Sequence, residues 1–137
     1  MEPITLIVTG ATVLTVVSIA FGGTFVLRVV TGGQPANELQ KSFFRAGHAH
    51  AGVLVTLGLV CALLLSAGDV RGPWQYAYLG VLAAAILIPA GFFLSVLGRD
   101  PQRPGRLIAL LWAGAAVLAL GLLAVGLALL ITGVRAL

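Results

Sequence analysis

Charged residues are scarce in this sequence, and so is cysteine. Eight Lys or Arg and four Asp or Glu side chains make up 9% of 137 residues, whereas a soluble domain averages about 25%. Twelve charges cannot cover a 14.0 kDa globule in water, which argues against a cytosolic enzyme. The cations occur in ones, twos and threes along the connections, so their pattern does not indicate nucleic-acid binding. A single cysteine, Cys61, excludes an intramolecular disulfide and with it a secreted disulfide scaffold.

Apolar residues are abundant, at 60% of the chain with a mean hydropathy of +1.12. They form four uninterrupted runs, at about 4–30, 43–66, 74–97 and 107–134. Each run is near or above the roughly 20 residues that cross a bilayer as a helix. Because lipid leaves no partner for free backbone groups, and because the connections are short, the runs predict antiparallel helices. We expect an all-α integral membrane protein in which residues 1–137 form one transmembrane domain, an antiparallel four-helix bundle.

The cations are unevenly divided between the two ends of this bundle. Arg71 and Arg135 lie at one end, and the remaining six lie in or beside the connections 31–42 and 98–106. Positive charge favours the cytoplasmic side, so these two connections are predicted to be cytoplasmic and both termini outside. The expected location is a bacterial inner (plasma) membrane. The six cations are Arg28, Lys41, Arg45, Arg99, Arg103 and Arg106.

Two features predict how the helices meet. Gly114, Gly121 and Ala128 recur every seven residues and place small side chains on one face of the last helix, which favours close backbone packing. The partner can be another helix of this chain or a second copy of it. Pro89 removes a hydrogen bond to Ala85 and predicts a kink in the third helix.

Both histidines of the chain, His48 and His50, lie near the start of the second span. An imidazole inside a membrane is costly and points to function, unless it lies at headgroup level and faces water. At 100° per residue the two rings point about 200° apart, so they are not expected to chelate one ion. All four acidic residues lie in loops or at the N-terminus, which disfavours a zinc site.

A single inward imidazole suits haem, which needs one axial nitrogen, a flat apolar slot and cations for its propionates. Small residues beside the histidines leave room for the macrocycle, and Phe92 and Phe93 are candidates to line it. Three arginines are candidate partners for the propionates. Alternatively, they only determine the topology and are solvated by lipid headgroups. The small residues are Ala49, Ala51 and Gly52, and the candidate partners are Arg45, Arg99 and Arg106.

Short motifs that follow one another in order along nearly the whole chain resemble the styrene oxide isomerases, which are small four-helix membrane proteins. Ala49-His50-Ala51-Gly52 is similar to the family's Ala-His-Ser-Gly element, with extra residues between it and the preceding Arg-Ala pair. Gly91-Phe92-Phe93-Leu94 is similar to Gly-Phe-Tyr-Leu. The other matching segments are Ala20-Phe21-Gly22-Gly23, Val30-Thr31-Gly32-Gly33, Arg45-Ala46 and Pro104-Gly105-Arg106.

The resemblance implies a haem b protein that assembles as a homotrimer, with haem near the protomer interface. By motif, His50 is the axial ligand of the iron, and His48 is the second choice because the extra residues make the spacing ambiguous. The implied activity is isomerisation of a small hydrophobic epoxide to a carbonyl compound, in which ferric haem acts as a Lewis acid without an external reductant. The expected partners are the lipid bilayer, a small hydrophobic molecule and further copies of the chain, but no nucleic acid.

Two positions depart from the family pattern. The family's substrate-positioning tyrosine and asparagine correspond to Phe93 and Thr56, which are therefore the catalytic candidates. Phe93 has no hydroxyl, and the shorter Thr56 can bond its own helix backbone instead. These departures keep two alternatives open. One is a haem protein without isomerase activity, working in electron transfer, gas sensing or haem handling, and the other is a haem-free packing or transport module.

Overall fold

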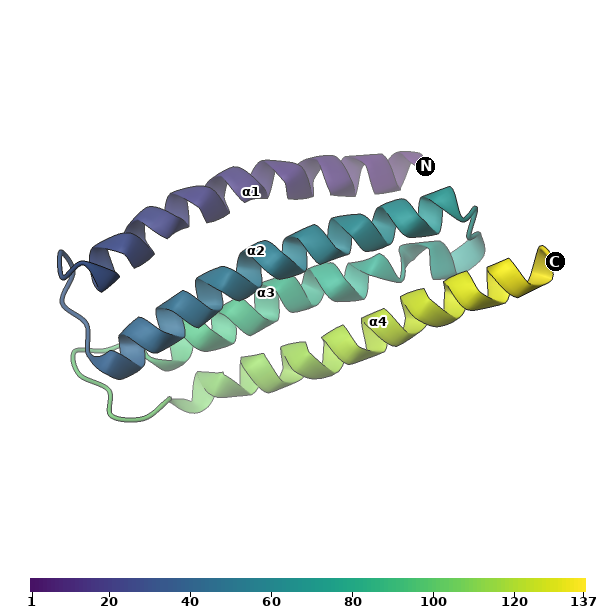
Figure 1. The fold of residues 1–137 in the computed structure, drawn as a ribbon. Coiled ribbons are helices and arrows are strands. Elements are labelled where there is room, and N and C mark those ends of the chain that lie inside the picture. The colour runs from purple at the N-terminus through teal and green to yellow at the C-terminus, as the bar shows by residue number, and fades with distance from the viewer.

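Four long helices make up the chain, as a computed structural model covering residues 1–137 shows. Neighbouring helices run antiparallel, and both termini lie at the same end (Figure 1). Each helix is long and apolar enough to cross a membrane, which confirms the all-α membrane-spanning fold. The α-helices are α1 (Pro3–Val30), α2 (Glu38–Ala67), α3 (Tyr78–Ser95) and α4 (Ala109–Arg135), with short 3₁₀ helices η1 (Gly72–Tyr76) and η2 (Arg106–Ile108).

The helix ends differ from the apolar runs where polar residues or proline decide the backbone. α2 begins at Glu38 rather than at residue 43, because Asn37 and Gln40 form a capping box. The Asn37 side chain accepts a hydrogen bond from the Gln40 N–H (2.9 Å), and the Gln40 side chain accepts one from the Asn37 N–H (3.1 Å). The third run starts as the 3₁₀ helix η1, which contains Pro73, so the α-helix begins only at Tyr78.

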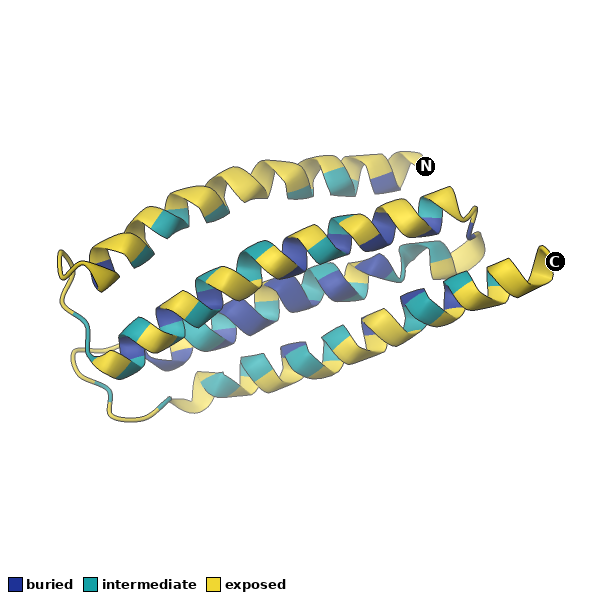
Figure 2. Cartoon of the chain, viewed as in Figure 1, coloured by how far each residue is buried: buried dark blue, intermediate teal, exposed yellow.

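The helices are unequally packed. Most buried residues lie on α2, α3 and the facing side of α4, whereas α1 is almost entirely exposed (Figure 2). Only Thr5 and Val29 of α1 are buried, and α1 packs mainly against α2. Exposed apolar side chains are the normal outer surface of a helix in lipid. Three helices therefore form the packed part of the bundle, and α1 lies along its outside.

The small-residue stripe of α4 packs against α3 of the same chain. Gly114, Gly121 and Ala128 are all buried. A Cβ placed on Gly114 would lie 2.9 Å from the Ile88 backbone N, and one on Gly121 would lie 3.0 Å from the Val81 backbone N. These separations are too short for a real Cβ, so the glycines set the α3–α4 distance. The predicted close packing is confirmed, and the partner left open by the sequence is α3.

Side-chain amides tie the start of α2 to the α3–α4 connection. Gln40 is 6% exposed and donates to the carbonyls of Val96 and Gly98, both at 3.0 Å. Asn37 donates to Asp100 (2.7 Å) and to the Pro101 carbonyl (2.8 Å). These bonds hold the end of α3 against the first turns of α2, about two to three turns before His48.

Candidate functional site

His50 is exposed on the surface of the chain and is held in one orientation. Its Nδ1 lies 2.8 Å from the Ala46 carbonyl oxygen, one turn earlier on α2. A carbonyl oxygen only accepts hydrogen bonds, so Nδ1 carries a proton, and in the neutral imidazole Nε2 keeps the free lone pair. A second nitrogen fixed by a backbone carbonyl is the usual arrangement of a histidine that ligates a metal.

Aromatic rings from two helices flank His50. The Phe92 ring of α3 lies 5.1 Å from the imidazole, centroid to centroid, at 36°. Phe43 of α2 contacts the Phe92 ring edge to face at 5.5 Å. The three rings form an apolar side of α2, which we call the His50 side. Gly52 lies about 200° around the helix from His50, on the other side of α2, and a Cβ there would meet nothing within 4 Å.

His48 lies on the other side of α2, against α1. A Cβ on Gly23 would lie 3.2 Å from His48 Nε2, and one on Gly22 would lie 3.9 Å from Nδ1. Of the four imidazole nitrogens in the chain, only Nδ1 of His50 has a hydrogen-bond partner within it. The two rings therefore have different surroundings, as expected from their opposite directions on the helix.

His48 faces a groove between α1, α2 and α3, with a volume of about 430 Å³. Its α1 wall carries the hydroxyls of Thr12, Thr15 and Ser18. The sequence analysis did not find this wall. The available signal was the recurrence of small polar residues every three or four positions, which places them on one helix face.

The two catalytic candidates lie apart from His50 in a single chain. Phe93 stacks on Phe44, with centroids 5.5 Å apart at 19°, and it lines the groove of His48. Thr56 is exposed and donates its hydroxyl to the Gly52 carbonyl at 2.9 Å. Six residues of helix turn Thr56 about 120° away from His50. Phe92 is the aromatic candidate that the fold brings to His50.

Glycine explains how Phe93 reaches its place. A Cβ on Gly47 would lie 2.8 Å from the Phe93 ring, so only glycine lets the ring rest on the α2 backbone. Gly47 is itself buried. Gly47 therefore sets the separation of α2 and α3 at the level of the histidines.

The three candidate propionate partners lie at the histidine end of the bundle. Arg45, Arg99 and Arg106 are all exposed, and none forms an ion pair. The two ion pairs of the chain join Lys41 to Glu38 and Arg71 to Asp69. Arg45 also lines a hollow of about 720 Å³ together with Ala46 and Ala49. All three guanidinium groups are available to an external anion.

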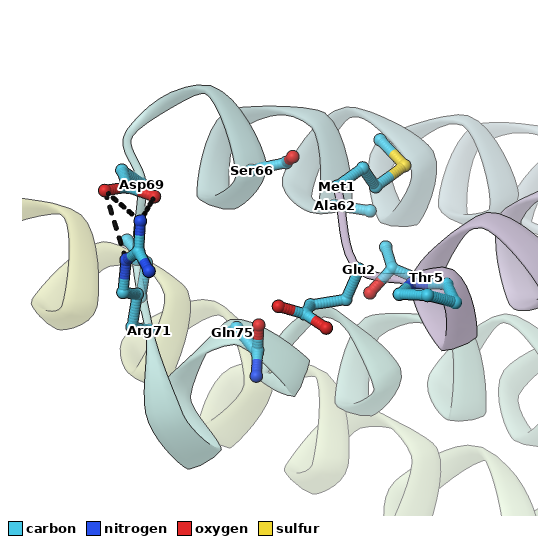
Figure 3. Close-up of a pocket in the computed structure, with 10 residues that line it drawn as sticks. Met1, Glu2, Thr5, Ala62, Ser66, Asp69, Arg71 and Gln75 are labelled. Carbon is cyan, nitrogen blue, oxygen red and sulfur yellow. Dashed lines mark hydrogen bonds and ion pairs between the residues drawn. The ribbon is translucent and has the colours of Figure 1, made fainter.

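A polar cavity of about 250 Å³ lies at the opposite end of the bundle. Figure 3 shows Arg71 turned onto Asp69, and Glu2 projecting into the space beside Gln75. Hydrogen bonds to Asp69, followed by its negative charge, raise the pKa of Arg71, so the guanidinium stays cationic. This ion pair closes the turn between α2 and η1 and is remote from both histidines.

No protein-family model, characterised protein or solved structure matches this chain. The resemblance to the styrene oxide isomerases accordingly rests on the sequence motifs. No three His, Cys, Asp or Glu side chains gather around one point. The candidate functional groups are therefore two separate imidazoles, His48 and His50, on opposite sides of α2.

Proposed function

We propose that this membrane protein binds haem b through Nε2 of His50 and isomerises a small hydrophobic epoxide to a carbonyl compound. The observation that carries the proposal is the contact of His50 Nδ1 with the Ala46 carbonyl at 2.8 Å. In the neutral imidazole this contact leaves Nε2 with its lone pair, directed away from its own helix, which is what an axial ligand requires.

The surroundings of His50 suit a flat apolar group. Phe92 offers an aromatic face beside the imidazole, and Phe43 packs edge to face against Phe92. Arg45, Arg99 and Arg106 supply unpaired cations at the same end of the bundle for two carboxylates. Each of these features supports haem as the group that His50 holds.

Bound ferric haem supplies a Lewis acid that polarises an epoxide oxygen and needs no reductant. The chain's part is to hold and surround the reactants. The Ala46 carbonyl orients His50, and the rings of Phe92 and Phe43 would give a bound group an apolar surface beside it. Thr56 donates its hydroxyl to its own helix, so the epoxide is oriented mainly by shape.

We also propose the homotrimer that the resemblance implies. His50 is exposed in the single chain, and a haem there would be covered by a second copy. Native mass spectrometry of detergent-purified protein tests this, and a monomer that retains haem contradicts it. The proposed setting is a bacterial inner membrane with connections 31–42 and 98–106 in the cytoplasm. Labelling of cysteines introduced at Arg103 and Arg135, in a Cys61→Ala background, tests the orientation in intact cells.

The primary experiment combines a spectrum with an activity assay on protein from haem-replete cells. We expect a Soret band in the absorption spectrum and conversion of styrene oxide to an aldehyde without NAD(P)H. A Soret band without turnover contradicts the isomerase and leaves the haem site. A colourless protein contradicts both, and leaves the haem-free packing or transport module.

A second candidate, a haem protein without isomerase activity, is favoured by one specific observation. Neither Phe93 nor Thr56 brings a free hydrogen-bonding group to His50 within the chain. Electron transfer, gas sensing or haem handling needs no such group. A six-coordinate spectrum, or fast reversible reduction by a quinol, supports this candidate, whereas a five-coordinate ferric spectrum with epoxide turnover supports the isomerase.

A further inference from the structure

His48 is a polar side chain inside a membrane span for which the chain provides no hydrogen-bond partner. Its ring lies against Gly22 and Gly23 and faces the groove between α1, α2 and α3. A polar group without a partner in an apolar medium costs free energy, so an intramembrane imidazole of this kind points to a ligand. The haem proposal does not use His48.

The groove is large enough to hold a small molecule that contains a ring. Its volume is about 430 Å³, and its α1 wall runs from Thr12 to Gly22, which are about 15 Å apart along the helix. Ser18 and Ile86 at its rim are exposed, Ile86 at 71%, so the groove opens sideways towards lipid. A molecule dissolved in the bilayer can enter without passing through water.

The polar groups of the groove are mostly acceptors. Thr12 and Thr15 donate their hydroxyls to the carbonyls of Val8 and Thr12, both at 2.7 Å, so only their lone pairs remain. A neutral His48 offers one acceptor and one donor, and Ser18 offers both. This excess of acceptors suits a ligand that carries an O–H donor.

The ends of the groove are apolar. Phe93 closes one end, held by its stack on Phe44, and Leu82 and Ile86 of α3 line the remainder. An aromatic ring gains contact with Phe93, while its hydroxyl reaches the polar α1 wall.

We propose that this groove is a second binding site, separate from His50, for a lipid-soluble aromatic molecule that carries a hydroxyl group. His48 and Ser18 hold the hydroxyl, and Phe93 contacts the ring. The two imidazoles point about 200° apart on α2, so occupancy of this groove does not depend on haem. Such a site gives the protein a means of taking a small molecule from the bilayer.

The test uses 4-hydroxybenzophenone, a phenol that crosslinks under ultraviolet light, with the full chain in lipid nanodiscs. We expect saturable labelling that mass spectrometry places on residues 12–22 of α1 and 48–55 of α2. His48→Phe raises the half-saturating concentration about tenfold, which corresponds to about 1.4 kcal/mol. Ser18→Leu fills the rim of the groove at an exposed position and abolishes saturable labelling.

Two controls separate specific binding from partition into lipid. Thr24→Ala removes a hydroxyl from another face of α1, where Thr24 bonds the Phe21 carbonyl, and leaves labelling unchanged. Plain benzophenone lacks the donor, and we expect it to bind the wild type about tenfold more weakly than the phenol does. We expect its affinity for His48→Phe to equal its affinity for the wild type.

Labelling spread evenly over lipid-facing residues overturns the proposal, as does labelling that His48→Phe and Ser18→Leu leave unchanged. The same assay on His50→Ala separates this proposal from the haem proposal. The groove is expected to label normally in that variant, while a missing Soret band in the wild type bears only on His50.

Discussion

The two sides of α2 around residues 48 and 50 contain the same functional group in opposite settings. His50 is exposed, hydrogen-bonded through Nδ1 to Ala46 and flanked by Phe92. His48 lies against the glycines of α1, has no hydrogen-bond partner and faces a groove with hydroxyls. One side offers a single oriented nitrogen, and the other offers a space with several weak polar contacts. One helix therefore presents two imidazoles to different surroundings.

Glycine and phenylalanine produce this difference. Gly23 allows α1 to approach the His48 ring, and Gly47 allows Phe93 to lie under α2. Phe92, the next residue along, meets His50 instead. Successive residues on a helix point 100° apart, so the Phe92-Phe93 pair divides its rings between the two histidines.

The largest expected effect comes from removing each imidazole in turn. His50→Ala is expected to abolish the Soret band of protein from haem-replete cells, because the only other imidazole, that of His48, points to the opposite side of α2. His48→Ala is expected to keep most of that band. Absorption spectra before and after dithionite measure both variants. The reverse pattern would make His48 the axial ligand and break the comparison.

Valine at two glycines of α2 separates a packed face of the helix from an open one. Gly47→Val is expected to destabilise the bundle by about 2 kcal/mol, because its Cβ alone would lie 2.8 Å from Phe93. Gly52→Val meets nothing within the chain and points about 200° away from His50, so it is expected to leave both stability and haem binding unchanged. Thermal unfolding in detergent and haem titration measure the two effects. Equal destabilisation by both variants would contradict the packing described for Gly47.

Truncation of the two phenylalanines tests their division between the histidines. Phe92→Ala is expected to weaken haem binding about tenfold through loss of the ring beside His50, on the order of 1.4 kcal/mol. Phe93→Ala is expected to retain haem and to lose labelling in the groove. Haem titration and the crosslinking assay report on each variant. A Phe93→Ala variant that loses haem as strongly as Phe92→Ala would show that the two sides are not independent.

The smallest expected effect comes from one methyl group on α1. Gly23→Ala places a Cβ 3.2 Å from His48 Nε2, so the ring or α1 must shift by a few tenths of an ångström. We expect labelling in the groove to change about two- to threefold, less than 1 kcal/mol by the affinity scale, with no change in the Soret band. Gly10→Ala, which meets nothing within 4 Å, serves as the matched control. A change in the haem spectrum of Gly23→Ala would connect the two sides through α2.

Much of the architecture could be predicted from local patterns. Four apolar runs of bilayer length lead to four helices, and short connections lead to antiparallel neighbours. The stripe of Gly114, Gly121 and Ala128 correctly predicted close packing. The start of α2 was wrong, because its first turns are polar and depend on the Asn37–Gln40 capping box rather than on hydropathy.

The candidate site could be predicted only in part. The spacing of His48 and His50 was sufficient to place them on opposite faces, and the small residues indicated room beside them. The helical period already turns Thr56 about 120° away from His50. The position of Phe93 could not be predicted in this way, because it depends on which helix lies against each face of α2. The hydroxyls of α1 could be assigned to a candidate site only because the structure places His48 in the same groove.

The sequence by itself determined the helices, their direction, the uneven distribution of cations and the angle between the two imidazoles. All of these follow from composition and from the 3.6-residue period, which are local properties of the chain. The tertiary structure alone decided that α4 packs on α3, that α1 lies along the outside of the bundle, and that Phe92 meets His50 while Phe93 lines the groove of His48. The physical reason is that contacts between helices depend on how side chains far apart in sequence fill one another's space, and no local period specifies the neighbour.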